Sequence, residues 1–240
     1  EVFRVEGFTQ PGVFQDISFN LRKGEILGVA GLMGAGRTEI MRAIFGVDPH
    51  ESGKLYFEGK EIHIKNPGDA IRQGFGFITE NRKTEGLILD FSIERNIALP
   101  SEERLAKSHV INDKNEFDFS SELSKRLGVK AQDINLPAST LSGGNQQKVV
   151  IAKWVGMHPK LLILDEPTRG IDIGAKKDIY DLMNELTAKG VSIIMVSSEL
   201  PEVIGMSDRI LVIHEGRAAG IVEHKDATQT RIMTLATGGE

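Results

Sequence analysis

The feature that most constrains the fold is a buried strand that leads into a glycine-rich loop and then into a helix. Residues 26–30 (ILGVA) form an apolar run, residues 31–36 (GLMGAG) carry three glycines, and helix-favouring residues follow Arg37. A run without polar alternation is typical of a parallel strand covered by helices on both faces. Similar runs recur at residues 161–164 (LLIL), 191–196 (VSIIMV) and 210–213 (ILVI). Their alternation with amphipathic helical stretches predicts an α/β fold with a mostly parallel sheet.

The middle of the chain is predicted to be helical. Residues from about 87 to 138 have little strand character, residues 120–127 favour a helix, and Ser92 can cap a helix that starts near Ile93. A chain of 240 residues fits a single two-lobed unit. We therefore expect a helical subdomain at about residues 87–150, inserted between the two parts of a core. The core is expected at about residues 1–86 and 151–240.

Composition excludes several classes of protein. The 29 basic and 34 acidic residues leave a net charge of −5, which argues against nucleic acid as the main partner. Cysteine is absent, so neither disulfides nor thiolate metal sites can form. The histidines have no ligand-like spacing and are interpreted as solvated or capping residues; they are His50, His63, His109, His158, His214 and His224.

The apolar runs also bear on membrane association. None approaches the roughly 18 to 20 residues that a membrane-spanning helix needs. The chain begins with Glu1, and no signal-like stretch follows. We expect a cytoplasmic piece of a longer chain, one that reaches a membrane through a partner.

Residues 31–38 (GLMGAGRT) fit a phosphate-binding loop, GxxxxGK[ST], except that Arg37 replaces the lysine. Glycines allow successive backbone N–H groups to converge on phosphate oxygens, and the helix N-terminus adds partial positive charge. Thr38 would supply a hydroxyl to Mg²⁺. Arg37 keeps the charge, but its planar fork does not have the compact shape of a lysine ammonium. The alternative is a glycine-rich turn that binds no ligand.

An acidic pair follows one of the buried strands. Asp165 can orient Mg²⁺ through a water molecule, and Glu166 can polarise a water that attacks a γ-phosphate. Acidic pairs at strand ends are common, so the pair alone leaves a purely structural role open. The longer string DEPTRGID, at residues 165–172, is much more specific.

The segment LSGGNQQK, at residues 141–148, is the strongest signal in the chain. Ser142, Gly143 and Gly144 precede a helix that is predicted to run through Gln146 to Trp154. They would present a hydroxyl and free N–H groups at a helix N-terminus, which is a ready anion site. The alternative is an ordinary Ser/Gly helix cap. A second phosphate site is hard to explain within one domain.

With these motifs, the chain resembles the nucleotide-binding domain of ABC transporters. It is most similar to the second, C-terminal ATPase half of bacterial importers for monosaccharides of the ribose, galactose and xylose kind. The shared strings are GLMGAGRTE at residues 31–39, RKxxGL at 82–87, LSGGNQQK at 141–148, DEPTRGID at 165–172, SSELPEVIGMSDRI at 197–210 and ATGG at 236–239. The resemblance implies a P-loop ATPase fold with a mostly parallel core sheet, an antiparallel β region and an inserted helical lobe.

The resemblance also implies roles for individual residues. Glu166 would polarise water, Ser198 stands where the family places a γ-phosphate contact, and Mg²⁺ would be bound by Thr38, Glu80 and Asp165. Phe8 lies where the family stacks a ring on adenine, and Asp172 where it makes a contact across a dimer. The nucleotide, ATP or ADP, would be bound by Phe8, Gly31, Leu32, Met33, Gly34, Ala35, Gly36, Arg37, Thr38, Glu39, Ser142, Gly143, Gly144 and Asp172.

Three positions depart from the family pattern. Arg37 replaces the lysine, Glu80 replaces a glutamine that touches Mg²⁺, and Ser198 replaces a histidine that reaches the γ-phosphate. In the family two such domains pack head to tail, and each ATP lies between the phosphate loop of one and the LSGG segment of the other. We therefore expect a weak site in this chain and an intact LSGG segment that completes the site of a sibling N-terminal ATPase domain.

The implied function is ATP-driven import of a monosaccharide. The implied partners are the sibling domain, membrane permease subunits and, indirectly, a periplasmic or extracellular sugar-binding protein, but no nucleic acid. The location would be the cytoplasmic face of the cell membrane. An alternative is a regulatory half that binds nucleotide but hydrolyses little itself. Soluble ABC ATPases of translation or DNA repair are disfavoured by the acidic charge.

Overall fold

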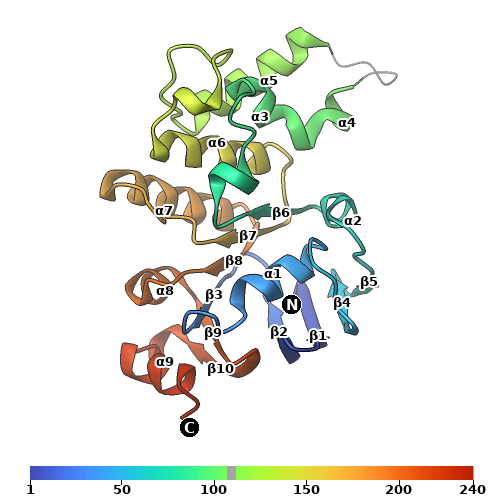
Figure 1. Cartoon of the computed structure of the whole chain (residues 1–240), viewed down its shortest axis with the longest axis vertical. Helices are drawn as coiled ribbons and strands as arrows, with labels where there is room; N and C mark the ends of the chain where they lie inside the picture. Colours follow the sequence, from blue (N-terminus) through green and yellow to red (C-terminus); the bar gives the residue numbers. More distant parts are fainter. Residues whose placement is uncertain (107–111, 240) are drawn as a thin grey trace. The chain divides into compact units, whose positions relative to one another are not determined.

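A computed structural model describes residues 1–106 and 112–239; His109 lies outside them. The described residues form two compact units (Figure 1). The first unit comprises residues 1–75, 160–166 and 182–240, and the second comprises residues 76–159 and 167–181. The predicted helical subdomain, residues 87–150, falls within the second unit. The predicted domain boundaries remain a prediction.

In the described part of the first unit, four strands form an antiparallel sheet with the order β2-β1-β4-β5. Buried residues are spaced irregularly along β1 and β2, because one face of the sheet is covered and the register shifts at bulges. The strands are β1 (Phe3–Gln10), β2 (Phe14–Leu21), β4 (Ser52–Phe57) and β5 (Lys60–Ile62). The antiparallel region that the resemblance implied is therefore present.

A second sheet has six strands within the described residues, in the order β10-β9-β3-β8-β7-β6. β3 runs parallel to β8 and β9, and β7 runs parallel to β8, whereas β9 and β10 are antiparallel. The strands are β3 (Ile26–Gly31), β6 (Phe75–Ile78), β7 (Leu161–Asp165), β8 (Ser192–Val196), β9 (Arg209–His214) and β10 (Arg217–Glu223). All four predicted apolar runs are strands of this sheet, and the mostly parallel arrangement is confirmed.

Helices of the first unit cover this sheet (Figure 1). They are α1 (Arg37–Ile44), α8 (Leu200–Met206) and α9 (Gln229–Ala236), whereas α2 (Pro67–Arg72) lies between β5 and β6 in the chain. α8 and α9 pack on β3 and β9 around a core that includes Ala30, Val203 and Ile232. Gly28 of β3 allows α8 to approach, because a Cβ there would lie 2.8 Å from a methyl carbon of Val203.

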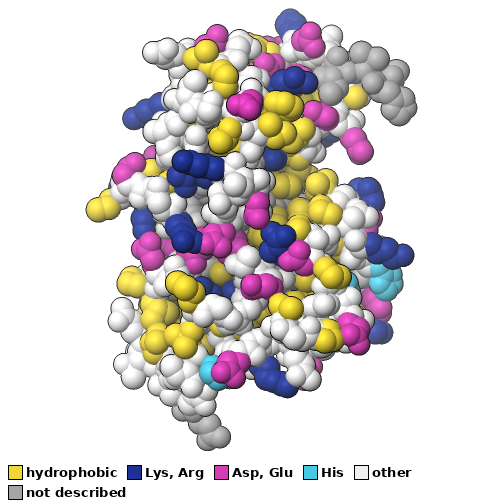
Figure 2. Space-filling view, in the orientation of Figure 1, with side chains coloured by type: hydrophobic (Ala, Val, Ile, Leu, Met, Phe, Trp, Pro, Cys, Tyr) yellow, Lys and Arg dark blue, Asp and Glu magenta, His cyan; other side chains and the backbone are white. Residues whose placement is uncertain are grey.

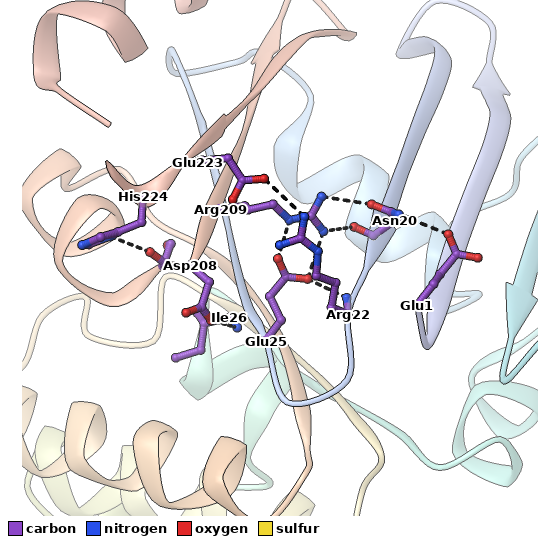
Figure 3. Close-up of polar contacts among 10 residues, drawn as sticks. Glu1, Asn20, Arg22, Glu25, Ile26, Asp208, Arg209, Glu223 and His224 are labelled. Carbon is purple, nitrogen blue, oxygen red and sulfur yellow. Dashed lines mark hydrogen bonds and ion pairs between the residues drawn. The ribbon is translucent and has the colours of Figure 1, made fainter. Parts of the chain in front are cut away.

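A buried ion pair joins the beginnings of β3 and β9 (Figure 3). Arg209 binds the Glu25 carboxylate, with Nη2 and Oε2 2.9 Å apart, and the two side chains are 6% and 4% exposed. Arg209 also donates to the backbone and side-chain oxygens of Asn20, at 2.8 and 3.0 Å. The Asp208 carboxylate accepts a hydrogen bond from the backbone N–H of Ile26 at 2.9 Å. These bonds hold β2, β3 and β9 together at the edge where β3 begins.

The second unit is mainly helical. Ser92 accepts a hydrogen bond from the Arg95 N–H at 3.1 Å and so caps α3, as predicted. The predicted helical stretches at residues 120–127 and 146–154 lie in α5 and α6, except that Leu127 is the C-cap of α5. The helices are η1 (Arg82–Gly86), α3 (Ile93–Ala98), η2 (Leu99–Ser101), α4 (Glu102–Leu105), α5 (Asp113–Arg126), η3 (Ala138–Thr140), α6 (Gly143–Val155) and α7 (Ile173–Ala188), which crosses the unit boundary.

Surface features place few limits on partners. On the face shown in Figure 2, Lys and Arg side chains are intermixed with Asp and Glu side chains. Over residues 1–106 and 112–239, no helix has both the length and the hydropathy to cross a membrane.

Candidate functional site

The glycines of the loop between β3 and α1 leave backbone groups accessible to a ligand. Gly34 and Gly36 have φ angles of 78° and 94°, which only glycine adopts without strain. Gly31 is also required, because a Cβ there would lie 2.5 Å from the carbonyl oxygen of Ile213. No described side chain caps the N-terminus of α1, so its first N–H groups are available to an anion. Met33, at the tip, is 96% exposed.

Arg37, the first residue of α1, is folded back onto the protein. Its Nη1 donates a hydrogen bond to the backbone oxygen of Ser197, directly after β8, at 2.7 Å. Its Nη2 lies 3.9 Å from Oε1 of Glu166, and the two side chains are only 11% and 10% exposed. The guanidinium charge is therefore shared between a carbonyl and a carboxylate of its own domain.

Glu166 and Ser198, the two residues predicted to be catalytic, contact each other directly. The Ser198 hydroxyl donates to Oε2 of Glu166 at 3.1 Å. Glu166 has a φ of 49°, a strained value for a residue with a side chain, and its N–H bonds the Val196 carbonyl at 2.9 Å. The neighbouring Ser197 hydroxyl donates to the carboxylate of Glu202. Both residues predicted to be catalytic thus lie at the ends of β7 and β8, with Arg37 beside Glu166.

Asp165, the last residue of β7, is fully buried. Burial raises the pKa of its carboxyl from 3.8 to about 6, although the Thr38 hydroxyl opposes the shift. Neither carboxylate oxygen has a well-formed hydrogen bond to any described residue. Such oxygens beside a threonine hydroxyl suit Mg²⁺, a hard cation that binds through one or two protein oxygens plus water and phosphate. The described residues contain no cluster of three or more His, Cys, Asp or Glu that could hold a metal ion by themselves.

Phe8, predicted to contact adenine, is fully buried in β1. Its ring stacks on Phe14 with centroids 5.6 Å apart and contacts the His50 ring at 4.4 Å. Burial of that histidine lowers its pKa. An adenine could reach the Phe8 ring only if these neighbours moved, so the adenine contact stays a prediction.

A cavity beside the loop was missed by sequence reasoning. Its volume is about 380 Å³, within the range of small-molecule sites. Val13 lies on its wall, is 43% exposed, and brings its carbonyl oxygen to 3.4 Å from where a Cβ of Gly36 would be. No local pattern reveals this approach, which depends on the β1–β2 turn meeting the loop before α1. The lining residues are Thr9, Pro11, Gly12, Val13, Phe14, Gln15, Glu215 and Arg217.

In the second unit, the LSGG segment lies at the N-terminus of α6. Ser142 occupies the N-cap position, but its hydroxyl does not cap the helix; it accepts a hydrogen bond from Nδ2 of Asn145 at 3.0 Å. Asp172 is nearby: its Oδ2 lies 3.7 Å from where a Cβ of Gly144 would be, and its Oδ1 accepts from the Ala175 N–H at 2.9 Å. The predicted residues Ser142, Gly143, Gly144 and Asp172 therefore form one cluster.

Glu80, predicted to bind Mg²⁺, forms an ion pair with Arg169 within the second unit. Sequence reasoning did not find this partner, since the two residues are far apart along the chain. The predicted metal contact of Glu80 stays a prediction.

Comparison with known proteins decides the family. Residues 14–169 match the family described as ABC transporter. The chain belongs to that family. This ABC domain is 60% identical over 239 residues to the ribose import ATP-binding protein RbsA of Bacillus subtilis (strain 168). It is 59% identical over 239 residues to a protein of the same name from Bacillus cereus. Each alignment covers 100% of this chain and 48% of the relative, so the domain spans about half the length of these curated relatives.

Solved structures confirm the fold. A nucleotide-free ATP-binding cassette from an ABC transporter superposes with a TM-score of 0.83 at 20% identity, over 100% of both chains. Another cassette, in its ADP conformation, gives a TM-score of 0.81 at 19% identity over 99% of both chains. The predicted ABC ATPase fold and the predicted family are therefore confirmed.

Proposed function

We propose that this ABC domain is the ATP-binding half of a subunit that drives import of a monosaccharide of the ribose kind. The observation that carries the proposal is about 60% identity along the whole chain to proteins named ribose import ATP-binding protein. The acidic net charge of −5 disfavours the alternative of an ABC ATPase that acts on nucleic acid.

The proposed partners follow from length and from the LSGG cluster. Since this domain spans about half of its relatives, the other half has room for a sibling ATPase domain. The sibling would receive Ser142 and Gly144 at its γ-phosphate, while Asp172 would contact it from the neighbouring loop. Permease subunits and a sugar-binding protein would complete the importer, with this domain at the cytoplasmic face of the membrane.

We propose that the domain's own site binds nucleotide weakly and turns it over slowly. The N–H groups of the loop at residues 31–36 would hold the phosphates. Arg37 can contact a phosphate only after it leaves the Ser197 carbonyl, to which it is bonded at 2.7 Å. The Ser198 hydroxyl is bonded to Glu166 and is shorter than the histidine it replaces. These contacts support a degenerate site.

Asp165 and Glu166 would have separate roles in the proposed site. Asp165 and Thr38 would hold Mg²⁺, which when bound would neutralise charge on the phosphates. Glu166 would orient the attacking water and accept its proton, but here its carboxylate faces Arg37 and Ser198. A regulatory half that binds nucleotide and closes on its sibling without hydrolysis is the alternative, and the Arg37 contacts favour it for the isolated domain.

The test uses the full-length subunit, reconstituted in vesicles with its permease and sugar-binding protein. Ribose should stimulate ATP hydrolysis, whereas a disaccharide should not. Ser142→Arg should abolish this stimulation, because it blocks the sibling's site. Glu166→Gln should cost far less than the equivalent substitution in the sibling domain. Full activity of Ser142→Arg would exclude the donated-site role, and complete loss with Glu166→Gln would exclude the degenerate site.

A further inference from the structure

The π-helical turn η1, which follows β6, packs against α6, the helix that begins in the LSGG segment (Figure 1). Gly86 packs on Val150: a Cβ at Gly86 would lie 3.1 Å from a methyl carbon of that residue. Lys153, only 9% exposed, donates from Nζ to the Gly86 carbonyl at 3.0 Å. These contacts fix the C-terminal end of η1 against the C-terminal half of α6.

Arg82, at the other end of η1, reaches the start of α6. Its Nη1 donates to the backbone oxygen of Arg169 at 3.1 Å. Its Nη2 would be 2.7 Å from a Cβ at Gly143, so the guanidinium lies directly against the LSGG segment. Its Nε is buried and has no hydrogen-bond partner among the described residues. The side chain therefore fills the space between the LSGG segment and the loop that leads to Asp172.

This place suits an arginine. Its planar fork donates in more than one direction, whereas a lysine ammonium on a flexible stem fixes a single point. The charge itself is unfavourable beside the N-terminus of α6, where the helix dipole is positive, so Arg82 acts there through its hydrogen bond and its packing. Removing the guanidinium would allow the LSGG segment and the loop at residues 169–172 to shift independently.

We infer that Arg82 is a positioning residue, which holds the LSGG segment and the loop at residues 169–172 in the single arrangement that the sibling domain's ATP requires. This inference rests on the proposed function, in which both segments face the sibling. Because η1 also contacts α6 at Gly86, a displacement of η1 would move α6 and the LSGG segment with it. Arg82 thus acts on hydrolysis in a site to which it contributes no phosphate-binding group of its own.

The experiment compares Arg82→Gln and Arg82→Lys in the reconstituted full-length subunit. Lys83→Gln is the matched control, because Lys83 is the neighbour in the same turn. Misplaced groups lower rates by up to about 100-fold, so Arg82→Gln should reduce kcat by about 10- to 100-fold. KM for ATP should change little, since the phosphate loop of the sibling is untouched. Arg82→Lys should give an intermediate kcat, and Lys83→Gln should match the unaltered subunit.

Controls separate this inference from a structural role and from the proposed function. Thermal unfolding and fluorescent ATP binding should stay unchanged in Arg82→Gln; a loss of kcat that only follows a loss of folded protein overturns the inference. If Arg82→Gln does not fold, Arg82→Lys decides, and an unchanged kcat overturns it. Ser142→Arg is measured alongside. An active Ser142→Arg subunit refutes the proposed function, whereas an inactive one with fully active Arg82 variants refutes this inference alone.

Discussion

Replacing Asp165 by asparagine should stabilise the chain in the absence of nucleotide and divalent cations. Burial raises the pKa of this carboxyl from 3.8 to about 6, so the folded state binds a proton more readily than the unfolded state between these values. Stability is therefore lost as the pH rises through this window. The rise in pKa from 3.8 to about 6 corresponds to about 3 kcal/mol. Asparagine stays neutral and avoids this loss.

The assay is urea unfolding of the 240-residue chain and of Asp165→Asn between pH 5 and pH 8. The variant should be more stable by about 3 kcal/mol at pH 7.5 and by about half as much at pH 5. Asp178→Asn is the control of opposite sign, because Lys148 lowers the pKa of that exposed carboxyl and its loss should cost about 0–1 kcal/mol. Equal stability of Asp165→Asn and the unaltered chain at pH 7.5, or a difference that persists undiminished at pH 5, would refute the reasoning.

Three further predictions concern buried charges. Glu25→Ala should cost about 3–5 kcal/mol in urea unfolding, because it leaves Arg209 charged and buried; a loss below about 1 kcal/mol would contradict the assigned burial. Burial lowers the pKa of Lys153 to about 8, so the unaltered chain should gain stability as the pH rises from 8 to 10.5. Lys153→Met should remove most of that rise. A pH profile of stability parallel to that of the unaltered chain would contradict the prediction. Arg37→Lys, which loses the fork that reaches the Ser197 carbonyl, should bind fluorescent ATP about tenfold more tightly; unchanged affinity would show that Arg37 does not obstruct nucleotide.

Features that depend on neighbours in sequence were predictable. β3 and β8 could be predicted because both faces of each strand are covered, which leaves an unbroken apolar run. The Ser92 cap could be predicted because the donor lies three residues later, at Arg95. Local patterns of this kind carry their physical cause within a few residues.

Features that depend on distant neighbours were not predictable. The Arg37 side chain bonds a carbonyl 160 positions away, and nothing near Arg37 reveals that choice. The stacking of Phe8 depends on Phe14 and His50, which come from separate segments. The adenine contact of Phe8 was implied by the resemblance alone, and nothing in the sequence revealed that its ring is buried.

The contact between Arg37 and the Ser197 carbonyl sets the fraction of molecules in which the Arg37 side chain is free. A hydrogen bond from a charged group is worth about 1.5–3 kcal/mol, so the conformer with a free Arg37 would make up about one molecule in ten to one in a hundred and fifty. A ligand that needs the minor conformer binds with an affinity reduced by that fraction. The loop can therefore keep a sound backbone geometry and still bind poorly, because most molecules at any moment already hold an internal substitute for the phosphate.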